Sequence, residues 1–523
     1  MTQEWLADFL SKFRAGYFIA QSLTVFALFL AGLCFVMLIK RRLESPVHVL
    51  LAYPAGLSLY LLSGVILLVT KQRFAAASLI ITMLILMLLG YMVTSAVSGT
   101  CRGFAPVKPS LLITVLIAAI LVSIIACSGI FPVSLWNDSM YPYSLYPRAI
   151  VRYGYLKRKF NVFLTDVGLG SAVTGTLPWI FGFNETFGIQ AALNLDFLIF
   201  FGFMVRETAG RKGPVRNVIT ACGLLLLVTS MPFAVISGWA MSNMYFTEFL
   251  FICTGSAAYF AKKAGEQKNT AGDILLLSVI TAAMSFFRME GMMIAAFVIL
   301  SYTMIGLSGK LLALFSVLPC MVLYGLYYIR IFIIMTINAP YTFLNRTKAV
   351  IQMVALTALF LYLILIQGRV KKTLSKHLKV IIIAGLVLAN LILFFLDPAL
   401  YTADLKAFYL NLTHMSGWGV FPVFVVSALA VTLCCQITDK KKPSVSYMDF
   451  VSISYILITL GVSFARGDPL QENVGDSGNR VLLQIVPVLM FAVIEHLTEC
   501  AKEEPSSPHI TSAGQDDLKE PIL

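Results

Sequence analysis

The chain has 523 residues, of which 59% are hydrophobic and 12% are charged, with a net charge of +13 and a mean hydropathy of +0.86. Soluble domains carry about twice that charged fraction, so the composition excludes an ordinary soluble protein. Much of the positive charge lies in short loops, where it reports membrane topology, and we therefore predict no nucleic-acid partner. The nine Cys form no CxxC or Cys/His cluster that would indicate zinc.

Hydrophobic runs of about 17–25 residues, the length that a helix needs to cross a bilayer, recur from end to end of the chain. They predict an all-α fold, a polytopic transmembrane helical bundle of about 15 crossings. The predicted segments lie near residues 17–39, 48–70, 74–97, 110–133, 187–205, 217–239, 244–261, 273–287, 291–307, 311–336, 350–367, 378–396, 420–437, 451–465 and 481–498.

The Lys and Arg residues of the short loops predict the orientation, because cytoplasmic loops are enriched in them. Alternate loops are basic and are therefore predicted to be cytoplasmic; the opposite set is poorer in basic residues and predicted to be external, although Lys71 and Arg73 are an exception. The basic set includes Lys40–Arg42, Arg206–Arg216, Lys262–Lys268, Arg369–Lys376 and Lys440–Lys442.

This alternation allows a single crossing between the loop after Val133 and the basic loop Arg206–Arg216. Because Val167–Phe183 is interrupted by glycines and Pro178, we predict that it lies in or along the outer leaflet instead of crossing. The external loop then covers residues 134–188. We expect N-terminal transmembrane helices over 1–109, a core over 110–498 and a disordered cytoplasmic tail over 499–523.

The start of this loop, Ser134–Thr165, is a polar stretch that is too long and too aromatic for a simple connection. Long loops in compact proteins are usually functional or disordered, and aromatic residues argue against disorder. Asp138 is its first acidic residue, and it stands among Trp136, Tyr141, Tyr143 and Tyr146, before the basic residues Arg148, Arg152, Lys157, Arg158 and Lys159. The alternative interpretation of Asp138 is a solvated loop carboxylate.

Further charged residues occur near helix ends that are predicted to be external. Glu248 is either a functional acid or an interfacial side chain that reaches water. Arg288 and Glu290 either pair within their short turn or present the Arg to an anionic group. Arg480 opens the last segment, Arg330 lies within a predicted helix, and Asp196 lies deeper still. A gathering of charge at one surface favours chemistry at the outer leaflet over transport, which places polar residues near the midplane.

Several short motifs occur in the order typical of one family. They are WNDSMYPYSLYPRAIVRYG, LPWIFGFNETFGIQAALNLDFLIF, MYFTEFLF, FFRMEGMM and DSGNRVLLQIVPVLM, and they span about Leu112 to Leu497. In this order the chain resembles the GT-C superfamily of integral-membrane glycosyltransferases, which use polyprenyl-phosphate-linked sugars and include the protein O-mannosyltransferases and the lipid A aminoarabinose transferase. Three additional N-terminal segments, and Asn137–Asp138 in place of an acidic pair, depart from the family pattern.

The resemblance implies sugar transfer from a polyprenyl-phosphate donor by a single inverting displacement. Asp138 is the expected base that takes the proton of the acceptor hydroxyl, and Glu248 is a second acid that positions the acceptor or a metal. Arginines would stabilise the phosphate leaving group as its charge develops. The expected donor-binding residues are Arg288, Arg480, Lys157, Arg158, Lys159 and Arg330; the expected substrate contacts are Trp136, Tyr141, Tyr143, Glu290 and Asp476.

The expected partners are the polyprenyl-phosphate-linked sugar, a glycan, lipid or protein acceptor, and the lipid bilayer. A divalent metal, Mg or Mn, is optional, since arginines alone can neutralise a monophosphate. We expect a bacterial inner or plasma membrane with the active site facing outward. Two alternatives stay open: a polytopic transporter or lipid flippase, and a glycan ligase or polymerase that uses diphosphate-linked glycans.

Overall fold

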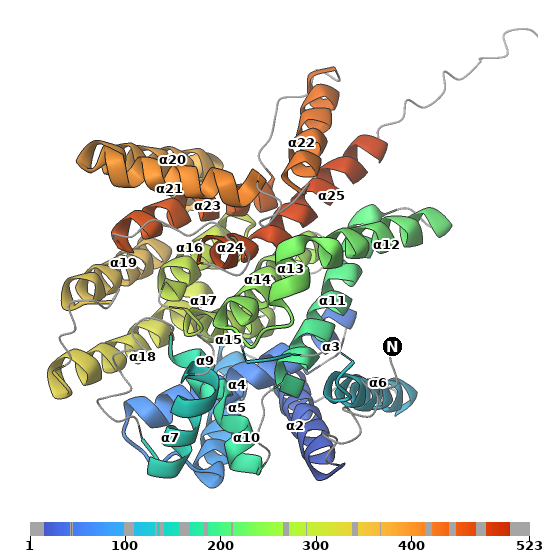
Figure 1. Cartoon of the computed structure of the whole chain (residues 1–523), viewed down its shortest axis with the longest axis vertical. Helices are drawn as coiled ribbons and strands as arrows, with labels where there is room; N and C mark the ends of the chain where they lie inside the picture. The colour runs from blue at the N-terminus through green and yellow to red at the C-terminus, as the bar shows by residue number, and fades with distance from the viewer. Residues whose placement is uncertain are drawn as a thin grey trace, which may run out of the picture.

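The computed structural model describes residues 15–41, 43, 45–98, 109–130, 133–135, 141–155, 168–182, 187–210, 213–264, 271–288, 290–336, 344–366, 368–413, 421–438, 446–466 and 477–502. Within these ranges the chain is helical apart from its connections and an isolated parallel bridge between Ser134 and Trp239. An all-α architecture is therefore confirmed. Figure 1 shows the helices as one assembly, with α14 and α15 near its middle.

The first half of the chain contains long helices separated by a group of short ones. The long helices are α2 (Ala15–Lys40), α4 (Ala52–Val69), α5 (Ala76–Ser98), α6 (Pro109–Cys127), α11 (Phe187–Ala209), α12 (Pro214–Thr229) and α14 (Ser242–Ala264). The short helices are α3 (Pro46–Leu50), η2 (Tyr141–Leu145), α7 (Tyr146–Tyr153), α9 (Leu169–Thr174), α10 (Thr176–Phe181) and α13 (Met231–Ile236).

The second half begins with the antiparallel neighbours α15 (Ala271–Ser285) and α16 (Gly291–Met304). A near-continuous helical rod follows: α17 (Gly309–Leu312), η3 (Ala313–Val317), α18 (Leu318–Tyr328) and η4 (Ile329–Ile334), where η3 and η4 are π-helical. The remaining helices are α19 (Arg346–Leu365), α20 (Gly368–Leu396), α21 (Pro398–Thr413), α22 (Phe421–Thr438), α23 (Tyr447–Arg466), α24 (Ser477–Leu483) and α25 (Val486–Lys502).

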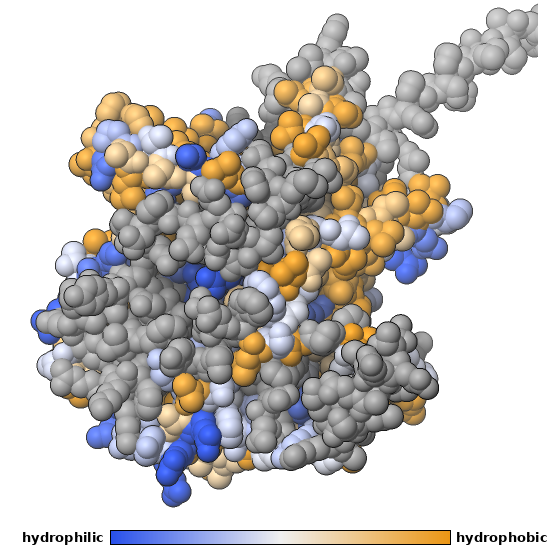
Figure 2. Space-filling view, viewed as in Figure 1, coloured by the Kyte–Doolittle hydropathy of each residue, from blue (hydrophilic) through white to orange (hydrophobic). Residues whose placement is uncertain are grey.

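Nine helices within the described ranges are long and apolar enough to cross a membrane, so the multi-pass membrane character is confirmed. Four further apolar helices, including α15 and α16, are shorter. The outer helices expose large apolar side chains, for example Leu84 at 58%, Val380 at 65% and Val426 at 66%. Figure 2 shows this apolar surface over α12, α20 and α22. Exposed apolar area on this scale marks a surface that contacts lipid.

The predicted segments differ from the helices where proline or local polarity intervenes. The segment 217–239 divides into α12 and α13 at Ser230, just before Pro232, because proline is accepted in the first turn of a new helix but not inside one. Val167–Phe183 contains α9 and α10, each of six residues and thus about 9 Å long, too short to span. Helix α21 lies in a stretch that we expected to be an external connection.

Helix α4 is the most deeply buried of the candidate spans, with 94% of its residues inside the protein. It packs against α2, α5, α9 and α15. Its contact with α2 brings the two backbones together: a Cβ on Gly56 would lie 1.9 Å from Leu28 O, and one on Gly32 would lie 1.7 Å from Ala52 O. Small residues at such crossings allow close packing without a hydrophobic driving force, as is usual in membranes.

Contacts between helix ends divide these ends into two groups. Lys40 Nζ lies 2.7 Å from Asp273, so the end of α2 meets the start of α15; we call this the Asp273 end. At the opposite end of α15, Gly170 N donates to Phe286 O at 2.7 Å, and we call this the Arg288 end. The alternation of basic loops predicts the same grouping. The loops at the Asp273 end were expected to be cytoplasmic, and those at the Arg288 end were expected to be external. Which end faces outward stays a prediction.

Candidate functional site

The turn between α15 and α16 holds Arg288 in a fixed position. Phe286 N and Phe287 N donate to Ala283 O and Met284 O, both at 3.1 Å, and these bonds close the end of α15. Gly291 then opens α16 so close to the preceding helix that a Cβ there would lie 2.3 Å from Ser285 O. The turn is therefore tight because residue 291 is glycine.

Two acceptors hold the guanidinium of Arg288. Nε donates to Glu290 Oε1 at 2.7 Å, and Nη1 donates to Asn243 Oδ1 at 2.6 Å. Both side chains of the ion pair are largely buried, Arg288 at 13% and Glu290 at 10% exposure. The pairing within the turn that we considered at the sequence level is thus present. A guanidinium has five N–H donors, so three stay available for an anionic ligand.

The long loop contacts this turn through backbone atoms. Gly168 has φ +85°, and a Cβ there would lie 2.5 Å from Phe286 O and 2.9 Å from Arg288 N. Gly170 N donates to Phe286 O at 2.7 Å. Glycine is required at Gly168 both for its left-handed conformation and for this approach. The second half of the predicted external loop is therefore built against the Arg288 turn.

The beginning of the same loop is held by the entry to α14. Ser134 N donates to Gly238 O at 2.8 Å, and Ala240 N donates to Ser134 O at 2.9 Å. Asn243, which accepts from Arg288, lies three residues after Ala240 on the same entry. The chain on both sides of Asp138 is thus joined to elements that hold Arg288, whereas Asp138 itself lies outside the described residues.

An aromatic stack links the loop to the core at this place. Tyr143 of η2 stacks on Tyr245 of α14 with ring centroids 6.2 Å apart, and Tyr245 stacks on Phe287 at 4.9 Å. The Tyr143 hydroxyl donates to Ser171 Oγ at 3.2 Å. Burial raises the pKa of Tyr143, so its phenol stays neutral at physiological pH. This geometry gives Tyr143 a packing role; its predicted substrate contact stays a prediction.

Glu248 is more deeply buried than we expected for an interfacial acid. Its exposure is 0%, and neither carboxylate oxygen has a hydrogen-bond partner among the described residues. It lies on α14 three residues after Tyr245, and Asp196 of α11 is close enough for its charge to act on Glu248. Oδ2 of Asp196 also lacks a hydrogen-bond partner within the described part of the chain. Glu248 is therefore buried inside the bundle and does not reach water at a helix end, and Asp196 is a second buried acid.

Amide side chains on α11 lie against the same α14 entry. Gln190 Nε2 donates to Trp239 O at 2.7 Å, and Asn194 Nδ2 donates to Ser237 O at 3.1 Å. Their carbonyl oxygens are buried without a hydrogen-bond partner in the described ranges. Unsatisfied buried acceptors are rare in folded proteins and cost free energy, so this group of oxygens indicates a functional region.

Helix α24 brings Arg480 to the Arg288 end. Helix α24 packs against α13, α14 and α21. Next to Arg480, Val481 O accepts from the Tyr455 hydroxyl at 3.2 Å, and Tyr455 is close enough to Glu290 and Arg288 for their charges to act on it. Arg480 is half-buried. The backbone next to Arg480 and the charges of the Arg288 turn therefore both lie near Tyr455 of α23.

The other predicted donor-binding residues are not joined to this group. Arg330 is buried on η4, and in the described residues neither a hydrogen bond nor an ion pair links its side chain to the Arg288 turn. The structure describes Tyr141 only by its place in η2. Outside the described residues lie Trp136, Asp138, Lys157, Arg158, Lys159 and Asp476.

No match was found for this chain among protein-family models, curated proteins or solved structures.

The site is therefore interpreted from its geometry alone. Sequence reasoning singled out Arg288, Glu290, Glu248 and Arg480, and their roles stay predictions. It missed Asn243, whose position directly before a predicted helix was the available signal. In the described part of the chain, no three His, Cys, Asp or Glu side chains gather as metal ligands. The chemistry that the arrangement supports is recognition of an anion by Arg288, beside a loop that carries a candidate base.

Proposed function

We propose that this protein is a membrane glycosyltransferase that moves a sugar from a polyprenyl-phosphate donor to an acceptor hydroxyl at the Arg288 end of the bundle. The observation that carries the proposal is the attachment of the Asp138 loop, through Ser134 on one side and Gly168–Gly170 on the other, to the elements that hold Arg288. Asp138 and Arg288 are distant in the chain, but the segments that carry them are bonded to the same elements. We therefore expect the base and the anion-binding Arg to act on one substrate.

In the proposed reaction, the acceptor oxygen attacks the anomeric carbon as the bond from that carbon to the phosphate oxygen breaks. Asp138 takes the acceptor proton, and the electron pair of the broken bond stays on the lipid phosphate. Arg288 stabilises the growing phosphate charge with the N–H groups that Glu290 and Asn243 do not use. Arg480, on the neighbouring α24, supplies a second positive charge. One displacement inverts the anomeric configuration.

The family resemblance implies that Glu248 contacts the acceptor or a metal directly. In this proposal its role is indirect. Because its carboxyl is fully buried, we expect it to act on the electrostatic potential of the site and on the position of α14, not by contact with the substrate. A metal is not required by the proposal, since Arg288 and Arg480 supply the positive charge. Mg or Mn bound by Asp138 stays an option for experiment.

One observation favours a second candidate, a transporter. Asp196 and Glu248 are both buried acids whose side chains keep oxygens without a hydrogen-bond partner among the described residues. Ionisable groups inside membrane helices often mark ion or proton pathways. A transporter of this kind would depend on Asp196 and Glu248 but not on Asp138 or Arg288. The two candidates are therefore separated by which pair of residues is essential.

The test is transfer or slow hydrolysis of a radiolabelled polyprenyl-phosphate sugar by the purified protein in nanodiscs. We expect Asp138→Asn and Arg288→Gln to abolish turnover while the exposed control Glu207→Gln keeps it. Full turnover by Asp138→Asn refutes the mechanism. If no donor binds, and proton or ion flux into proteoliposomes depends on Asp196 and Glu248, the transporter is correct instead.

A further inference from the structure

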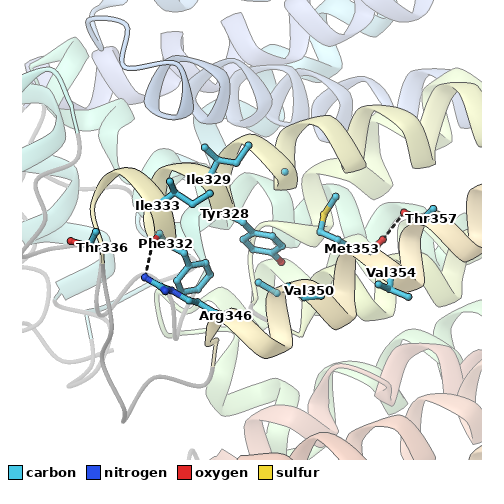
Figure 3. Close-up of a pocket in the computed structure, with 12 residues that line it drawn as sticks. Tyr328, Ile329, Phe332, Ile333, Thr336, Arg346, Val350, Met353, Val354 and Thr357 are labelled. Atoms are coloured by element: carbon cyan, nitrogen blue, oxygen red, sulfur yellow. Dashed lines mark hydrogen bonds between the residues drawn. The ribbon is translucent and has the colours of Figure 1, made fainter.

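A groove runs between the rod α18–η4 and the antiparallel helix α19, away from the Arg288 turn. Its volume is 660 Å³, within the range of about 300–1,000 Å³ that is usual for ligand pockets. Figure 3 shows Tyr328 and Phe332 of the rod on the side of α19, and Met353 of α19 on the side of the rod; Ile333, Val350 and Val354 complete the apolar lining. Apart from its two ends, the groove is lined by apolar side chains.

The groove opens toward the surface that contacts lipid. The side chains along its rim are strongly exposed: Ile333 at 68%, Val350 at 62% and Val354 at 62%. The segments that form its walls, Gly309–Ile334 and Arg346–Leu365, are both candidate membrane spans. In a bilayer, hydrocarbon chains would therefore cover this groove.

The depth of the groove corresponds to one leaflet. On α19 the lining residues extend from Arg346 to Thr357, which are eleven positions apart. On the rod they extend from Gly325 to Thr336, which are also eleven positions apart. At about 1.5 Å per residue each wall is roughly 16 Å deep. One leaflet contributes about half of the ~30 Å hydrocarbon core. A groove of this depth fits one acyl chain, whereas a polyprenyl chain is several times longer.

The shallow end of the groove is polar and positively charged. Arg346 is exposed there, and its Nη2 donates to Phe332 O at 3.1 Å, as Figure 3 shows. This bond directs the guanidinium across the groove mouth and leaves most of its five N–H donors available. At the opposite, deep end, Thr357 donates its hydroxyl to Met353 O at 2.8 Å and so presents no free donor.

The backbone beside the mouth is irregular. Helix η4 is π-helical, with Met335 N donating to Arg330 O at 2.9 Å, and it ends at Ile334; Thr336, two residues further, has φ +47°. π-Helical turns occur often at functional sites, and a non-glycine residue at positive φ is strained. These two features occur where the groove meets the charged end, so the irregular backbone shapes the mouth.

We propose that this groove binds one acyl chain of an anionic phospholipid, with the lipid phosphate on Arg346. The proposal rests on the length match to one leaflet, the apolar walls and the single guanidinium at headgroup depth. It is independent of sugar transfer, because it uses neither Asp138 nor Arg288. The lipid would fill the open groove between the rod and α19 and would hold these two elements together.

The test is native mass spectrometry of the full-length protein after exchange into nanodiscs that contain phosphatidylglycerol or phosphatidylcholine. We expect phosphatidylglycerol to stay bound to the wild type. Val354→Trp fills the groove and should abolish retention, whereas Ile351→Trp, an exposed position on another face of α19, should preserve it. Arg346→Gln should weaken retention about fivefold, as expected for one basic residue at an anionic headgroup.

A second measurement needs no variant. Phosphatidylglycerol with a photoreactive group midway along its acyl chain should crosslink to peptides that contain Met353 or Ile329 in the wild-type protein. Equal retention of the two lipids contradicts the role of Arg346. Retention by Val354→Trp at the wild-type level, or crosslinks confined to other helices, would falsify the site.

Discussion

Arg288 Nη1 lies 2.6 Å from Asn243 Oδ1, so a turn after α15 is tied to the second residue of α14, 45 positions earlier in the chain. Glu290 holds the other edge of the same guanidinium at 2.7 Å. The Arg is therefore oriented before any ligand arrives, and a ligand has less ordering entropy to lose. A preoriented Arg is what anion recognition requires.

A double-mutant cycle on Arg288 and Glu290 should reveal their coupling. We expect Arg288→Ala to lower the free energy of unfolding by about 1.5–3 kcal/mol, because a largely buried Glu290 loses its charged partner. Adding Glu290→Ala should restore part of that loss, with a coupling energy of roughly 0.5–3 kcal/mol. The measurement is unfolding of each purified variant in detergent. Strict additivity would mean that the pair does not stabilise the turn.

The Gly168 contact can be separated from its backbone conformation. Gly168→Ala and Gly182→Ala both place a side chain at positive φ, +85° and +79°, at a strain of about 1–2 kcal/mol each. A Cβ at Gly168 also meets Phe286 O at 2.5 Å, whereas no atom of the described residues lies within 4 Å of one at Gly182. Gly168→Ala should therefore lower the melting temperature more and alter ligand binding at Arg288. Equal effects would show that the loop does not rest on the turn.

The buried charges at the Asp273 end should make a large contribution to stability. Asp273 binds Lys40 at 2.7 Å and His48 at 3.0 Å, with each of the three side chains below 10% exposure. Removing one member of a buried ion pair costs about 3–5 kcal/mol, because the partner charge stays buried. We expect Asp273→Ala to reduce thermal stability strongly, and Glu207→Gln on the exposed surface to leave it unchanged. A small loss for Asp273→Ala contradicts the buried network.

Glu248 offers a test of the balance between stability and function. Replacing a buried polar group that lacks hydrogen bonds with an apolar group of similar size is nearly neutral or stabilising. Glu248→Met should therefore keep or raise the melting temperature while it reduces the proposed transfer activity. A marked loss of stability would show that the carboxyl has a structural partner. Unchanged activity would remove Glu248 from the proposed site.

Much of the helical pattern could be predicted, because apolar runs of about 20 residues have few alternatives in a bilayer. Helix α21 was missed because PALYTADLKAFYLNLT is too polar to be recognised as a span. Its start nevertheless carries a local signal: Asp397 Oδ1 accepts from Leu400 N at 3.0 Å and caps the helix, and Pro398 occupies its first turn.

Only those contacts of the site that join residues close together in the sequence could be predicted. Arg288 and Glu290 are two residues apart, so their pairing could be expected from the sequence. The Asn243 contact and the tight approach of Gly168 to Phe286 depend on which helices lie side by side, and no local pattern encodes that. Glu248 begins an apolar run, and the sequence alone left it either as a functional acid or as a side chain that reaches water. Its burial depends on how α14 packs within the bundle.

The burial of α4 has a consequence for biosynthesis. Tyr60 shares a hydrogen bond with Thr176 at 2.6 Å, and α4 packs against α15, more than 200 residues later in the chain. Helices enter the membrane in the order of their synthesis, so α4 is inserted long before α9 and α15 exist. In that interval its polar side chains face lipid or an insertion chaperone. The bundle therefore closes around its second long helix only after residue 285 has been made, and assembly is a late, cooperative event.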